Sequence, residues 1–174
     1  ALDSSRQQED LFRQIQALVG LGFNCLLSGD WNQAAEWAKE GIFLSRQVQS
    51  FELSDVLQCL GWALTYKGEL SSALELIQEA LELARQRQDE ALIIRLARRL
   101  AEIYDRQERW AISNELYQLH IVKDEELGRI VSKATYLALL GISYLKQGRY
   151  ENARQSLFES LLNADLDILP IALN

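Results

Sequence analysis

The sequence predicts an all-α protein, a solenoid of four antiparallel helix pairs. The first observation is composition: the 174 residues include nine Gly and a single Pro, Pro170, while the strong helix formers Ala, Leu, Glu, Gln and Arg dominate. The second is a break motif that returns every 39 or 40 residues. A single helix pair cannot bury its apolar face alone, so a fixed period of this length is typical of a repeat array in which neighbouring pairs cover one another.

The break motif is a turn followed by a large residue. Its four copies are Gly29-Asp30-Trp31, Gly68-Glu69-Leu70, Glu108-Arg109-Trp110 and Gly148-Arg149-Tyr150. Small residues recur at fixed distances from it, in the columns Gly22, Gly61, Ala101 and Gly141; Ala34, Ala73, Ser113 and Ala153; and Gly41, Ala80, His120 and Ser160. Small side chains let two helices cross at about 8 Å. Glycine at the break supplies the left-handed conformation that ends the first helix.

The breaks and the apolar spacing place eight helices along one domain, residues 1–174. We expect them at about 8–28, 31–48, 51–67, 70–88, 90–107, 110–126, 129–147 and 150–164. They pair into repeats at about 8–48, 51–88, 90–126 and 129–164. Residues 165–174, which include Leu166, Ile168 and Leu169, either cap the last pair or begin a further repeat.

Several function classes are excluded at this stage. The net charge of −7 argues against a nucleic-acid partner. No apolar run approaches the ~18 residues of a membrane span, and the N-terminus lacks a signal-peptide apolar region, so we expect a cytoplasmic protein without a membrane partner. The absence of Met, including at position 1, indicates either a processed protein or a segment of a longer chain.

Catalytic and metal-binding constellations are missing from the sequence. There is no Gly-rich phosphate loop and no nucleophile–base arrangement. Cys25 and Cys59 lie in helical patterns without a CxxC spacing, and we interpret them as small buried hydrophobes. His120, the single histidine, is either a junction residue between repeats or a pH-responsive joint. We predict no enzyme activity and no cofactor or metal.

The columns resemble the tetratricopeptide repeat family over roughly residues 11–164. Its Leu-Gly pair corresponds to Leu21-Gly22, Leu60-Gly61, Leu100-Ala101 and Leu140-Gly141, and its aromatic column to Cys25, Leu64, Tyr104 and Tyr144. The period is about 40 residues rather than the usual 34, and the Pro that usually closes the second helix is missing. This longer form is similar to the repeats of kinesin light chains, of Gα-binding spindle-orientation adaptors and of sensor regions in bacterial regulatory ATPases.

The resemblance implies a right-handed superhelix whose first helices line a concave, peptide-binding groove. The groove candidates are Phe23, Leu26, Gln58, Trp62, Arg95, Arg98, Arg99, Glu102 and Ile142. Phe23 and Trp62 are either hot-spot anchors or fillers of the helix seam. The arginines either select an acidic partner segment or form ion pairs within the chain, as Arg98 with Glu102.

We therefore predict a protein–protein interaction scaffold that binds a peptide or helical segment of a partner. One alternative is a structural spacer or self-association element that acts through the repeat ends. Another is the sensor segment of a larger bacterial regulatory protein. We expect simultaneous replacement of Arg95 and Arg99 by Glu to abolish partner binding without changing thermal stability.

Overall fold

The computed structural model describes residues 2–165, with side chains for residues 9–164. This part of the chain forms helices α1 Leu2–Ser28, α2 Trp31–Val48, α3 Leu53–Lys67, α4 Leu70–Gln86, α5 Glu90–Arg106, α6 Trp110–Glu126, α7 Ile130–Lys146 and α8 Tyr150–Asp165. The all-α prediction is confirmed, and the expected bounds agree to within about two residues except at the start of α1. The predicted cap or further repeat falls on residues 166–174, outside the described residues.

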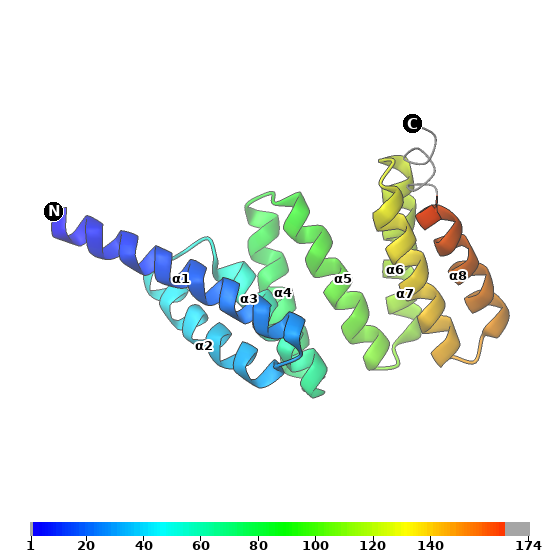
Figure 1. The fold of residues 1–174 in the computed structure, drawn as a ribbon, viewed down its shortest axis with the longest axis horizontal. Helices are drawn as coiled ribbons and strands as arrows, with labels where there is room; N and C mark the ends of the chain where they lie inside the picture. The colour runs from blue at the N-terminus through cyan, green and yellow to red at the C-terminus, as the bar shows by residue number, and fades with distance from the viewer. Residues whose placement is uncertain (1, 166–174) are drawn as a thin grey trace. The chain divides into compact units, whose positions relative to one another are not determined.

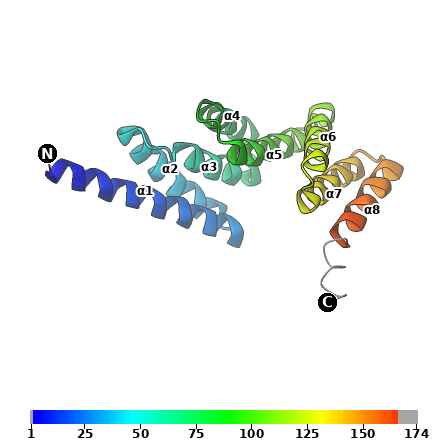
Figure 2. The same cartoon turned by 90° about the horizontal axis from the view of Figure 1, so that it is seen from above.

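The chain divides into two compact units, Ala1–Ile103 and Tyr104–Asn174, with the boundary inside α5. In unit 1, α1 packs against α2 and α3, and α3 packs against α2 and α4. In unit 2, α7 packs against α6 and α8. The hairpins α1–α2, α3–α4 and α7–α8 are visible in Figures 1 and 2. No helix within residues 2–165 combines the length and apolarity needed to cross a bilayer.

Each predicted break has a left-handed backbone. The φ angles are 82° at Gly29, 83° at Gly68, 59° at Glu108 and 71° at Gly148. At the second break the backbone N–H of Glu69 donates to the carbonyl of Leu64 at 2.9 Å, which satisfies a carbonyl at the end of α3. Glu108 shows that the conformation is kept even where the residue is not glycine.

The small-residue columns are points of close helix contact, as predicted. A Cβ added to Gly22 would lie 2.6 Å from the Sγ of Cys59, and one added to Gly61 would lie 2.7 Å from the Cδ1 of Ile77. A Cβ on Gly141 would lie 2.7 Å from the Cγ of Leu157. These distances are shorter than van der Waals contact, so the packing of each helix on its neighbour requires glycine there.

The two cysteines differ in environment. Cys59 is buried, which confirms its interpretation as a small core residue, whereas Cys25 is partly exposed. Burial raises the pKa of the Cys59 thiol to about 12, and the neighbouring Cys25 adds to the shift. The Cys59 thiol is therefore protonated and unreactive in the folded protein.

His120 is buried between α6 and α7. Its ring stacks on Tyr136 with centroids 4.7 Å apart and planes at 10°, and its Nδ1 has no hydrogen-bond partner among the residues that the structure describes. Burial lowers the pKa of His120 below its ordinary value of 6.5, with Asp124 opposing the shift and Lys123 adding to it. Asp124 itself accepts a hydrogen bond from the Ser132 hydroxyl. The folded state therefore favours the neutral imidazole.

The glycine contacts predict opposite effects for two Gly→Ala substitutions. Gly61→Ala forces a Cβ against the buried Ile77 side chain and should lower the free energy of unfolding by about 1–3 kcal/mol. Gly20→Ala meets no atom within 4 Å and should raise it by about 0.5–1 kcal/mol, because Ala is the better helix former. Urea unfolding monitored by circular dichroism measures both. A stable Gly61→Ala variant would contradict the close-contact interpretation.

The buried histidine predicts a loss of stability on acidification. Below pH 6.5 the unfolded chain binds a proton at His120 that the folded chain does not, because the folded pKa is lower. Stability from this residue is thus complete above pH 6.5 and declines as the pH falls toward the folded pKa. His120→Phe retains the ring and removes the titration, so its urea midpoint should decline less between pH 7 and pH 5. Parallel pH profiles for the two proteins would contradict the assignment.

Candidate functional site

The first helices of unit 1, α1, α3 and α5, are joined by a chain of side-chain contacts that begins at an aromatic pair. The ring centroids of Phe23 and Trp62 lie 6.3 Å apart, with the planes tilted by 57°. Each ring follows a close-contact glycine, Gly22 or Gly61. Successive helical residues are rotated by about 100°, so both rings lie at the edge of the packing and are half-buried. Half-buried aromatic rings offer apolar contact area to a ligand.

Arg99 of α5 fixes the Trp62 ring. Its guanidinium carbon lies 3.4 Å from the ring centroid, and its Nη1 donates to Glu102 Oε2 at 2.9 Å. Arg99 is only 8% exposed, and within the described part of the chain its Nε and the Trp62 Nε1 have no hydrogen-bond partner. Burial lowers the pKa of Arg99, while Glu102 opposes the shift. The guanidinium is therefore engaged within the chain by a cation–π contact and an ion pair.

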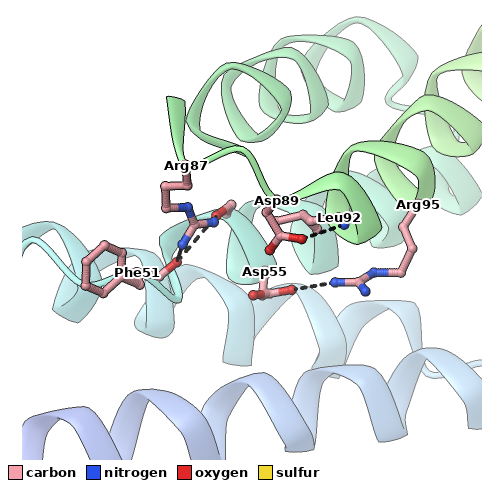
Figure 3. Close-up of polar contacts among 7 residues, drawn as sticks. Phe51, Asp55, Arg87, Asp89, Leu92 and Arg95 are labelled. Atoms are coloured by element: carbon pink, nitrogen blue, oxygen red, sulfur yellow. Dashed lines mark hydrogen bonds and ion pairs between the residues drawn. The ribbon is translucent and has the colours of Figure 1, made fainter. Parts of the chain in front are cut away.

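Arg95, one turn earlier on α5, reaches across to α3. Its Nη2 donates to Asp55 Oδ1 at 3.4 Å, as Figure 3 shows. The Arg95 side chain is 50% exposed, so this long ion pair is worth less than about 1 kcal/mol. Burial raises the pKa of Asp55, and the charges of Arg95 and Arg87 act in the opposite direction. Arg95 thus has a positioned guanidinium with donors still open to solvent.

Among the three groove-candidate arginines Arg95, Arg98 and Arg99, Arg98 has the fewest internal contacts. It is half-buried, and within the described residues it makes no ion pair or hydrogen bond, so the predicted pair with Glu102 is not formed. Glu102 is bound to Arg99 instead. Arg98 therefore carries a cationic head that a ligand could engage without breaking an existing pair.

A second polar cluster in unit 1 was missed by the sequence reasoning. Arg87, the residue that follows α4, donates to the carbonyl of Phe51 and to the hydroxyl of Ser54, and its guanidinium lies 5.8 Å from the Phe51 ring centroid (Figure 3). Beside it, Asp89 caps α5 by accepting from the Leu92 backbone N–H at 3.0 Å. The cluster borders a cavity of about 220 Å³ lined by Gln49, Ser50, Phe51, Leu53, Ser54, Leu83, Gln86 and Arg87. The sequence feature that could have pointed to this cluster is Phe51, an aromatic residue in the otherwise polar turn between α2 and α3.

The structure brings some of the predicted groove residues together and buries others. Leu26 is 2% exposed and Gln58 is 3% exposed, so neither has surface to offer a ligand, and we leave both out of the contact surface. Phe23, Trp62, Arg99 and Glu102 form one chain of contacts across α1, α3 and α5. Ile142 lies on α7 of unit 2, where its side chain is exposed.

Residues 57–91 match the family model for the tetratricopeptide repeat. This stretch of the chain is similar to a tetratricopeptide repeat. It includes most of α3 and all of α4, and with them Gly61, Gly68, Ala73 and Ala80 of the predicted columns. The resemblance is thereby confirmed for the second repeat. No curated protein sequence matches the chain at a significant level.

Solved structures of tetratricopeptide-like repeat proteins share the fold at low sequence identity. NprR in complex with its cognate peptide NprX has a TM-score of 0.76 at 18% identity, over 92% of this chain and 48% of NprR. The TPR-like repeats of a putative kinesin light chain from Podosopora anserina have a TM-score of 0.66 at 15% identity, over 86% and 74% of the two chains. MamA has a TM-score of 0.61 at 18% identity, over 88% and 80%. These likenesses establish the fold.

The different environments of two arginines predict different costs for the same substitution. Arg99→Glu places a carboxylate against the Trp62 ring and beside Glu102 in a buried position, and should lower the free energy of unfolding by about 2–4 kcal/mol. Arg95→Glu affects a half-exposed ion pair and should cost less than about 1 kcal/mol. Urea unfolding of the two single variants tests this. The earlier expectation that Arg99 can be replaced without a change in thermal stability does not fit the burial of this residue.

Proposed function

We propose that the chain is a protein-interaction scaffold and that the α1–α3–α5 face of unit 1 binds a segment of a partner protein. The observation that carries the proposal is a half-buried aromatic pair, Phe23 and Trp62, in which Arg99 holds the Trp62 ring. The neighbouring Arg98 is unpaired within the described residues. An aromatic ring that is already immobilised loses little conformational entropy on binding. The pair therefore supplies apolar contact area at low cost.

Arg95 and Arg98 give this face a preference for acidic side chains. Both guanidinium groups retain donors that are free of strong internal partners, and arginine pairs with carboxylates in a two-point geometry. The chain as a whole carries a net charge of −7, so an acidic segment would be drawn to this local cluster rather than to the protein in general. Ile142 lies on unit 2, where it is exposed, and is not part of this face.

The comparison with NprR supports a peptide as the ligand class. NprR has the same fold over nearly all of this chain, and its structure contains its cognate peptide. The low identity transfers the fold and not the ligand, so the chemistry of the bound segment is argued from Phe23, Trp62, Arg95 and Arg98 alone.

Selection from a phage-displayed library of random 12-residue peptides tests the proposal. The full chain is the target, and selected peptides are synthesised and measured by isothermal titration calorimetry. We expect sequences that combine an apolar residue with Asp or Glu. The double variant Arg95→Glu/Arg98→Glu should weaken their binding at least tenfold, because it replaces attraction of the carboxylates by repulsion.

The matched control is Arg46→Glu/Arg85→Glu. It makes the same charge change on the second helices α2 and α4, at exposed positions, and should leave the affinity within about twofold, as expected for charges that lie outside the contact. Equal losses in both double variants would indicate a response to net charge and would refute the proposed face. Binding that survives Trp62→Ala unchanged would refute it as well.

A further inference from the structure

The α7–α8 hairpin of unit 2 exposes a cavity-bearing apolar face. A cavity of about 390 Å³ is lined by Val131, Ala134, Thr135, Ala138, Ser160 and Ala164. On α8, Leu161 follows the lining residue Ser160 and is exposed. Figure 2 shows α7 and α8 side by side along their lengths. Apolar surface gathered around a cavity is a feature of surfaces that bind another element.

The repeat register shows what covers the same position in two earlier pairs. The column that contains Ser160 holds Gly41 in α2 and His120 in α6. Gly41 faces the Val56 side chain of α3 so closely that a Cβ would collide with it. His120 stacks on Tyr136 of α7. In each case the first helix of the next pair places a large side chain on this column.

The column four residues further along the second helices shows the same loss of cover at α8. The positions that correspond to Ala164 in the three preceding pairs are Ser45, Ala84 and Asp124, and all three are buried. Ala164 is exposed. Within the described residues, the α7–α8 face is therefore the same kind of surface as its predecessors, without the helix that covers them.

The two helices that cover these earlier faces, α3 and α7, share one apolar pattern, and α5 carries the same pattern. The buried sets are Val56, Leu60 and Ala63 in α3; Tyr136, Leu140 and Ser143 in α7; and Leu96, Leu100 and Ile103 in α5. Each set occupies positions i, i+4 and i+7, which lie on one side of a helix. The pattern is a large apolar residue, then Leu, then a small or apolar residue.

We propose that the α7–α8 face is a second binding site, for one amphipathic α-helix of a partner protein with this i, i+4, i+7 pattern. The large residue at i fills the cavity beside Ser160, as Val56 and Tyr136 fill the corresponding positions. The Leu at i+4 of the partner helix packs against Ala164 and Leu161 of α8. This site is distinct from the α1–α3–α5 face and does not depend on it.

A second copy of the chain does not supply the required helix. Among the described first helices, α1 is the one that no earlier pair covers, and its residues in this register are Ala17, Leu21 and Asn24. Ala17 is smaller than Val56, Leu96 and Tyr136, which occupy this position in the other helices, and it would leave the cavity of about 390 Å³ unfilled. The pattern therefore favours a different protein over head-to-tail stacking of copies.

A synthetic helix tests the site on the full chain. The probe is a fluorescein-labelled peptide with the sequence of residues 90–106, which carries Leu96, Leu100 and Ile103. Fluorescence anisotropy should show binding, and the Leu96→Asp peptide should bind at least tenfold more weakly. In the protein, Ala164→Arg should weaken binding of the parent peptide at least tenfold by occupying the cavity. Asn152→Arg, the same charge change on α8 outside the cavity lining, should leave it within twofold.

Three results would overturn the proposal. The first is equal affinity of the peptide for the parent protein and Ala164→Arg. The second is concentration-dependent dimerisation in sedimentation that Ala164→Arg removes, which would assign the face to a second copy. The third is peptide binding only after Leu166, Ile168 and Leu169 are replaced by Ser, which would assign it to the chain's own residues 166–174. Trp62→Ala should leave peptide affinity unchanged, which separates this site from the proposed α1–α3–α5 face.

Discussion

The close approach of helices at the small-residue columns is the constraint on which the rest of the structure depends. At Gly22, Gly61 and Gly141 there is no room for a Cβ, so these residues fix both the distance and the rotation of each helix pair. Because the rotation of each helix is fixed, the residue that directly follows the glycine lies at the edge of the helix contact, toward the surface. Phe23, Trp62 and Ile142 each follow one of these glycines, and each is at least partly exposed. The same contact thus builds the core and selects the candidate binding residues.

The arginines on α5 divide between structure and recognition because of small differences in position. Arg99 lies against Trp62 and Glu102 and is buried, which makes it a support for the aromatic face. Arg95 is one turn away and half exposed, while Arg98 is half-buried and unpaired within the described residues. A buried, paired guanidinium must first give up its internal ion pair and ring contact before it can bind another carboxylate, and that cost is larger than an exposed ion pair returns.

Local signals were sufficient to predict the helices and their breaks, and insufficient to predict which side chains face outward. The break at Glu108 was located by the period alone, without glycine, and its φ of 59° agrees. By contrast, Leu26 and Gln58 were expected on the groove and are buried, because a longer repeat changes the rotation of each helix relative to its neighbours. The burial of Arg99 depends on Trp62, which is 37 residues away in the sequence, and no local pattern carries that information. Long-range packing decided these residues.

The two proposed surfaces follow from the two directions in which a repeat can make contacts. Within unit 1, the residues that follow the close-contact column form a face of mixed aromatic and charged character, suited to a segment with acidic and apolar side chains. Along the stacking direction, Ser160 and Ala164 continue columns whose earlier members are buried by the next helix, and this face is apolar. A segment with acidic side chains suits the α1–α3–α5 face but would not fill the cavity of the α7–α8 face. An apolar helix suits the α7–α8 face but offers no carboxylate to the arginines of the α1–α3–α5 face. The difference in chemistry, set by the register of a single repeat pattern, would allow one chain to hold two unlike partners without competition between them.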